Sequence, residues 1–237
     1  MKSVLIKISG ETLSGADGKF GLNEIATVCD NVKNVIDSGI KVCLVIGGGN
    51  IVRGRDFQKS DLIASETADS IGMLSTVMNG IFMRDALRAR GLYVEAVSAL
   101  RLPFGILPND VFTVRELASR GAVIIFCGGV GLPYFSTDTV AVIAASMARC
   151  DALLKATKTD GIYDADPKIF DDAKHIPELT HSEAIQRNLQ VMDQTAFVLA
   201  SQRKLPIYVF AVNEPNCFMR AINGELKLSV VRSDSTQ

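Results

Sequence analysis

The chain has 237 residues, of which 48% are hydrophobic and 22% are charged, and its formal net charge at pH 7 is −1. This size suits one large or two small globular domains. The near-zero charge argues against nucleic acid, and no apolar run is long enough to span a membrane. The five cysteines are scattered and the histidines number two, which argues against disulfides, a zinc site or a histidine-based triad.

Short apolar runs alternate with helical patterns along the chain. The runs are continuous, which is typical of strands that are covered on both faces in a parallel sheet. The predicted strands are residues 4–9, 42–46, 93–97, 122–127, 152–156, 207–211 and 226–231. The last run alternates in polarity, which predicts a place at an edge of the sheet. The first run follows Met1 without a cleavage site, so it predicts a strand and a cytoplasmic protein, not a signal peptide.

Amphipathic segments separate these runs and predict helices. The first two predicted helices cover residues 25–39 and about 67–91. A third begins with a capping box at Thr113 and Glu116 and ends at Gly121. A fourth is capped by Ser136 or Thr137, and a fifth begins at Asp193 and ends before Pro206. Strands that alternate with helices predict α/β layers with right-handed crossovers. The polar residues 160–177 are predicted to form a long functional loop.

Three glycine-rich turns follow apolar strands directly. They are Lys7-Ile8-Ser9-Gly10, Gly47-Gly48-Gly49-Asn50 and Gly128-Gly129-Val130-Gly131. Glycine lets the backbone turn sharply and removes the side chain that would block a ligand, so exposed N–H groups there favour phosphate. Tight turning alone explains any single turn, but three at equivalent strand ends favour a phosphate-lined groove. None matches a P-loop, a dinucleotide fingerprint or a protein-kinase signature.

Five charged residues accompany these turns. Lys7 and Lys155 each interrupt an apolar strand, where a lysine alone is explained by a side chain that reaches solvent. Arg53 is either a solvated loop residue or a fork for phosphate oxygens. Asp138, in a first helical turn, either balances the helix dipole or holds the two lysines in place. Asp69, early in the long helix, either balances the helix dipole or accepts hydrogen bonds from ribose hydroxyls.

Five segments resemble the bacterial UMP kinases of the amino acid kinase superfamily. They are KISGE, VIGGGNIVRG, ADSIGMLSTVMNGIFMRDAL, GLPYFSTD and LLKATKTDGIYDADP. They occur in the family's order across nearly the whole chain, and GMLSTVMNG and KATKTDGIYDADP are specific to that kinase. The resemblance implies a three-layer αβα sandwich with a mainly parallel central sheet. It implies one domain over residues 1–237, with a monophosphate-binding half (about residues 1–150) and an ATP-binding half (about residues 151–237).

The same resemblance implies the reaction and its ligands. ATP would donate its γ-phosphoryl group to UMP, which gives UDP for pyrimidine nucleotide synthesis, and Mg²⁺ would arrive bound to ATP, with no metal ligand assigned in the chain. A homohexamer is implied, as are activation by GTP and inhibition by UTP. The loop of residues 15–21 resembles the effector-linked loop, with one extra residue. Near Glu95, members that respond to GTP tend to carry arginine, which weakens the expectation of GTP activation.

The resemblance also implies roles for individual residues. The catalytic residues would be Lys7, Asp138 and Lys155. The ATP-binding residues would be Lys7, Ile8, Ser9, Gly10, Gly49, Arg53, Thr157, Tyr163 and Asp166. The UMP-binding residues would be Gly48, Asp69, Val130, Gly131, Leu132, Pro133, Tyr134, Phe135, Ser136 and Thr137. The family commonly has TGNPFFTTD in this last loop, so a threonine hydroxyl and an asparagine amide are lost here, and details of base or phosphate recognition stay open.

Three alternative functions differ in what they need from the sequence. A kinase for an acyl or carbamoyl substrate, such as acetylglutamate, glutamate, aspartate or carbamate, would share the first two glycine turns but lack GMLSTVMNG and KATKTDGIYDADP. A non-catalytic nucleotide- or oxyanion-binding protein would not need Lys7, Asp138 and Lys155 together. A nucleic-acid-binding module would need a basic face or an aromatic platform, and the sequence favours neither.

Overall fold

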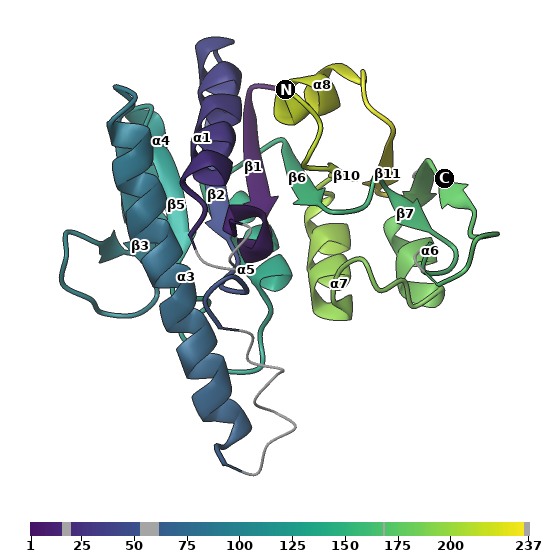
Figure 1. The fold of residues 1–237 in the computed structure, drawn as a ribbon, viewed down its shortest axis with the longest axis horizontal. Helices are drawn as coiled ribbons and strands as arrows, with labels where there is room; N and C mark the ends of the chain where they lie inside the picture. The colour runs from purple at the N-terminus through teal and green to yellow at the C-terminus, as the bar shows by residue number, and fades with distance from the viewer. Residues whose placement is uncertain (16–19, 53–61, 168, 235–237) are drawn as a thin grey trace.

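The computed structural model describes residues 1–15, 20–52, 62–167 and 169–234. Within these residues, a nine-stranded sheet with the order β4-β3-β5-β2-β1-β6-β10-β11-β9 forms the centre of the fold (Figure 1). Its strands are β1 (Ser3–Ile8), β2 (Lys41–Ile46), β3 (Val94–Ser98), β4 (Leu107–Pro108), β5 (Val123–Cys127), β6 (Ala152–Thr157), β9 (Glu178–Thr180), β10 (Ile207–Ala211) and β11 (Leu228–Arg232). Only β10 and β11 pair in antiparallel fashion within it. The prediction of an α/β fold with a mainly parallel sheet is confirmed.

The central strands are buried on both faces, as their unbroken apolar sequences predict. All residues of β5 are buried, and β1 and β2 are buried at every position after their first residue. Successive side chains of β1 point to opposite faces, so Val4, Ile6 and Ile8 join one hydrophobic cluster while Leu5 joins the other. Each fully buried aliphatic side chain of this kind contributes about 1.5–3 kcal/mol relative to an exposed one.

Helices cover both faces of the sheet. The cluster that contains Ile6 is completed by α1 (Leu22–Asp37), α3 (Ser65–Arg88) and α8 (Cys217–Asn223). The cluster that contains Leu5 is completed by α4 (Val111–Ser119), α5 (Thr137–Ala148), α6 (His181–Gln186) and α7 (Gln194–Arg203). The molecule is therefore a three-layer αβα sandwich, as expected. No helix among the described residues combines the length and the apolar character needed to cross a membrane.

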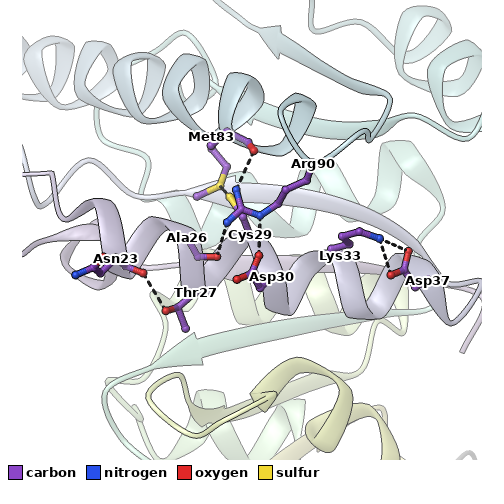
Figure 2. Close-up of polar contacts among 10 residues, drawn as sticks. Asn23, Ala26, Thr27, Cys29, Asp30, Lys33, Asp37, Met83 and Arg90 are labelled. Carbon is purple, nitrogen blue, oxygen red and sulfur yellow. Dashed lines mark hydrogen bonds and ion pairs between the residues drawn. The ribbon is translucent and has the colours of Figure 1, made fainter.

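A polar contact fastens α1 to the end of α3. The Arg90 guanidinium donates from Nε to Asp30 Oδ1 at 2.7 Å and from a terminal nitrogen to the backbone carbonyl of Ala26 at 3.1 Å (Figure 2). The Cys29 thiol meets the Met83 sulfur at 3.3 Å in the buried seam between the two helices. These contacts hold α3, which carries part of the candidate site, against the sheet.

Two local predictions are wrong. The helix α4 is capped by Asp110, whose Oδ1 accepts hydrogen bonds from the backbone N–H groups of Phe112 and Thr113 at 2.9 and 3.0 Å. The hydroxyl of Thr113 is itself bound to Asp110 Oδ2 at 2.7 Å, so Thr113 does not form the expected capping box. The strand β11 is not at the edge, because β9 pairs with it in parallel register.

Residues 160–177 are less irregular than predicted. β7 (Ile162–Tyr163) and β8 (His175–Ile176) form a short antiparallel pair inside this segment. The Ser229 hydroxyl links the pair to β11, since it accepts from the Ile162 N–H at 2.7 Å and donates to the Ile176 carbonyl at 2.5 Å. The segment is therefore attached to the main sheet at β11.

Candidate active site

The three glycine turns meet at one edge of the sheet. β1, β2, β5 and β6 are parallel neighbours, so their carboxyl ends and the turns that follow lie together. A Cβ atom on Gly10 would lie 2.5 Å from the Gly47 carbonyl oxygen and 2.6 Å from the Gly49 nitrogen. Only glycine fits there, and the first two turns therefore touch through their backbones.

The helix α3 holds the second and third glycine turns in place. The Thr76 hydroxyl accepts the Gly128 N–H at 2.9 Å, and the Asn79 amide donates to the Gly47 carbonyl at 2.6 Å. Residues three apart share one face of a helix, so the motif GMLSTVMNG places Thr76 and Asn79 toward the sheet. The sequence analysis assigns no role to Thr76 or Asn79, although their spacing in the motif indicates that they share one face of the helix.

A buried charge cluster stands at the centre of this edge. Lys7 and Lys155 are in register on β1 and β6. Their ammonium groups both contact Asp138 Oδ1, at 2.9 Å from Lys7 Nζ and 2.6 Å from Lys155 Nζ. The exposed fractions of the side chains are 9% for Lys7, 8% for Lys155 and 14% for Asp138. The contact required by the second interpretation of Asp138, in which it holds the two lysines in place, is thus present.

The N-terminus of α5 positions Asp138. Ser136 caps this helix, because its hydroxyl accepts the backbone N–H groups of Asp138 at 3.0 Å and Thr139 at 3.3 Å. Asp193, the N-cap of α7, receives hydrogen bonds from the hydroxyls of Ser136 and Thr139. Asp193 therefore ties the start of α5 to a helix far away in the sequence. The prediction that Asp193 begins a helix is confirmed, but its contact with the site was missed.

The charges shift the acidities of the cluster. Burial acts to raise the pKa of Asp138, but the positive charges of Lys155 and Lys7 outweigh it and lower that pKa to about 2. Burial lowers the pKa of Lys155 to about 8, although the Asp138 charge acts in the opposite direction. Near pH 7 the cluster therefore holds two ammonium groups and one carboxylate. Its net positive charge, at the rim of a glycine-lined edge, suits a phosphate chain.

A cleft of about 340 Å³ opens between α3 and the loop after β5. Its lining includes Gly48, Gly49, Asp69, Gly72, Met73, Thr76, Leu132, Phe135, Ser136 and Thr137. Asp69 Oδ2 accepts the backbone N–H of Tyr134 at 2.7 Å, and the Tyr134 hydroxyl contacts Glu66 one turn earlier on α3. Tyr134 has a φ of 71°, in the left-handed region. Two carboxylates of α3 thus hold the tip of this loop.

A second cleft, of about 370 Å³, lies beside the β7–β8 pair. Tyr163 and Asp166 line it, together with residues 187–191. The Tyr163 hydroxyl donates to Asp160 Oδ1 at 2.7 Å and accepts from Lys227 Nζ at 2.9 Å. Lys227 also pairs with Asp160 at 2.7 Å. These contacts give the wall of the cleft a fixed shape.

The structure brings together many of the predicted residues, with some exceptions. Thr157 does not line the second cleft, but its hydroxyl accepts the N–H of Thr159, which does, at 3.0 Å. The side chain of Ile8 is fully buried in the core, so only its backbone is available to a ligand. Of the predicted UMP-binding residues 130–137, those that do not line the first cleft are Val130, Gly131, Pro133 and Tyr134. Arg53 lies outside the described residues, as does most of the loop of residues 15–21.

The sandwich fold, the glycine turns and the paired lysines at one sheet edge define a kinase of the amino acid kinase type. A profile of the Amino acid kinase family matches residues 2–211, and the chain belongs to that family. A uridylate kinase from Campylobacter jejuni is 40% identical over 236 residues, which cover 98% of each chain. One from Aliarcobacter butzleri is 38% identical over 234 residues, which cover 98% of this chain and 99% of the relative.

Solved structures agree with these relatives. A crystal structure of UMP kinase from Bacillus anthracis superposes with a TM-score of 0.92 at 32% identity, covering 100% of this chain and 98% of that one. The UMP kinase from Ureaplasma parvum also gives a TM-score of 0.92, at 29% identity, covering 98% of this chain and 99% of that one. The similarity therefore extends over the whole chain and not only over the glycine turns.

Proposed function

We propose that this chain is a UMP kinase, which transfers the γ-phosphoryl group of ATP to UMP and forms UDP and ADP in pyrimidine nucleotide biosynthesis. The observation that carries the proposal is the contact of one buried carboxylate, Asp138, with two ammonium groups at the ends of neighbouring strands. Relatives at 38–40% identity over nearly the full chain, all named uridylate kinase, support UMP as the acceptor.

Each cleft takes one nucleotide in this proposal. UMP would occupy the cleft between α3 and the loop after β5, with Asp69 at its ribose. The adenosine of ATP would occupy the cleft beside β7, and its phosphates would reach Lys7, Ser9, Gly10 and Gly49 at the sheet edge. Contacts from Arg53, Thr157 and the loop of residues 130–137 complete the proposed set. Residues 1–150 would thus hold UMP together with the phosphates of ATP, and residues 151–237 would hold the adenosine of ATP.

The proposed chemistry needs charge neutralisation more than proton transfer. A phosphate monoester has its second pKa near ~6, so the acceptor is mostly dianionic at neutral pH and needs no general base. The obstacle is the repulsion between two polyanions. Lys7 and Lys155 would offset it and would stabilise the charge on the transferring group. Asp138 would hold both ammonium groups in place and keep them from repelling each other.

Magnesium fits the site as a companion of ATP. Mg²⁺ needs few protein ligands when phosphates and water complete its shell, and in the described residues no cluster of three or more His, Cys, Asp or Glu side chains is placed to hold a metal. The phosphates of ATP would therefore hold the ion. When bound, it would neutralise phosphate charge, and the lysines would supply the remaining positive charge.

We also propose a cytoplasmic homohexamer that is inhibited by UTP. An apolar hollow of about 570 Å³ on α3, lined by Phe20, Met78, Ile81 and Phe82, supports self-association. GTP activation is the less favoured part of the regulatory proposal. Glu95, the residue that argues against it, is bound to Arg88 at 3.0 Å.

The acceptor and the effectors can be tested together. Release of ADP should be measured at steady state with UMP, CMP and dUMP, each with and without GTP, and with acetylglutamate, glutamate, aspartate and carbamate as competing acceptors. We expect the highest kcat/KM for UMP and no turnover of the acyl and carbamoyl acceptors. Binding of ATP and UMP without UDP formation would instead indicate a non-catalytic nucleotide-binding protein.

A further inference from the structure

A cleft of about 390 Å³ lies among the ends of three helices, away from the glycine turns. It is lined by Val111, Arg115, Ala145, Ser146, Met147, Arg149, Cys150, Arg203 and Leu205. α5 begins at the candidate active site with Asp138 and ends at this cleft, after 12 residues. At the rise of an α-helix this separates the two sites by roughly 17 Å. The cleft, which we call the arginine cleft, is therefore distinct from both nucleotide clefts.

The arginine cleft carries an uncompensated positive charge. Arg115 comes from α4, Arg149 follows α5, and Arg203 lies in the last turn of α7. None of the residues that line the cleft is acidic, and within the described part of the chain none of the three guanidinium groups pairs with a carboxylate. Such a concentration is notable in a chain whose net charge is −1.

Helix dipoles explain part of this arrangement. The C-termini of α5 and α7 each bring about half a negative charge, which favours a cation at Arg149 and Arg203. The three arginines still leave a net charge of about +2 in the cleft. Arg115 lies in the middle of α4 (Val111–Ser119), outside both terminal turns, so the helix dipole does not explain it.

We infer that the arginine cleft binds a small phosphate-bearing anion. The planar guanidinium fork matches phosphate oxygens and binds them with two parallel hydrogen bonds, so three of them from three helices suit a phosphate group or chain. Val111, Met147 and Leu205 add an apolar wall for an attached organic group. The volume of the cleft is in the range of pockets for small ligands. The inference does not depend on the proposed reaction.

The test is calorimetric titration of the full chain in magnesium-free, low-salt buffer, with the nucleotide clefts saturated by ADP and UMP. The first probe is inorganic tripolyphosphate and the second is CTP. We expect one additional site per chain, and we expect binding to weaken as salt is added, since the arginines are exposed. A tighter Kd for CTP identifies a nucleotide as the ligand, and an equal or weaker one identifies the phosphate chain.

Variants distinguish binding in the arginine cleft from non-specific attraction of an anion to positive charge elsewhere on the protein. The triple variant Arg115→Gln, Arg149→Gln and Arg203→Gln should weaken the additional site about tenfold, since three exposed charge contacts each contribute a factor of about two to three. Its turnover of ATP and UMP should be unchanged. The matched control carries glutamine at Arg120, Arg220 and Arg232, which lie outside the arginine cleft and pair with acidic residues, and it should bind as the wild type does. If the triple variant does not fold, Arg115→Gln alone should still weaken the additional site. Absence of an additional site, or equal binding in the cleft variants and the control, would overturn the inference.

Discussion

Asp138→Asn is the most informative single substitution in the candidate active site. It keeps the size of the side chain but removes the charge that contacts Lys7 at 2.9 Å and Lys155 at 2.6 Å. The pKa of this carboxyl falls from 3.8 to about 2 in the folded protein, which corresponds to about 2 kcal/mol of net stabilisation of the ionised form. Without it, two buried ammonium groups would repel each other. Loss of one partner from a buried cluster costs about 3–5 kcal/mol, so a lower melting temperature is expected.

The effect on catalysis should be larger than a helix-dipole contact can explain. We expect kcat to fall about a hundredfold, because both lysines lose the group that positions them. The Asp138 charge acts to raise the pKa of Lys155, so its loss should move the alkaline limb of the rate profile below about pH 8. A helix-dipole contact alone is worth about 0.3–1 kcal/mol of stability and would leave kcat unchanged.

The assay is steady-state UDP formation over a pH series, with thermal melting of the same samples. Asp110→Asn is the matched control, since Asp110 also sits at a helix N-terminus but binds only backbone N–H groups and the Thr113 hydroxyl. The control should keep its rate and its pH profile. A folded Asp138→Asn variant with kcat within about threefold of the wild type would refute the positioning role of this carboxylate.

Three further outcomes follow from the same cluster and cleft. Lys7→Ala should lower kcat about a hundredfold in a folded protein. The control Lys33→Ala, at an exposed lysine paired with Asp37, should not change the rate. Near-normal turnover of the Lys7→Ala variant would remove Lys7 from the mechanism. Asp69→Ala should raise KM for UMP about tenfold with little change in kcat. A lower melting temperature with an unchanged KM would instead favour the helix-dipole interpretation of Asp69. The rate should fall above about pH 8, because burial lowers the pKa of Lys155 to about 8 and the ammonium group is lost there; a profile that stays flat to about pH 9.5 would contradict this.

The sequence was sufficient for the features that depend on periodicity and on strand order. Parallel strands bring Lys7 and Lys155 into register, and the helix start near Ser136 places Asp138 beside them. The contact among these three residues is therefore one of the two interpretations of Asp138 that the sequence left open. Their catalytic role stays a prediction.

Features that depend on distant partners could not be predicted in the same way. Asp193 binds Ser136 and Thr139 across more than 50 residues, and no local pattern reports that contact. β9 covers β11 although its short sequence has little apolar character. At α4, Asp110 caps the helix in place of the predicted Thr113, because its carboxylate reaches two backbone N–H groups and the Thr113 hydroxyl.

The central physical claim is that fixed cations and backbone turns at one sheet edge hold two nucleotides end to end. A crystal structure of the chain with UMP and a non-hydrolysable ATP analogue tests it most directly. We expect the Nζ atoms of Lys7 and Lys155 to lie within hydrogen-bonding distance of the phosphates between the two nucleosides, with Asp138 still in contact with both. Phosphates bound away from this edge, or lysines turned from them, would contradict the account.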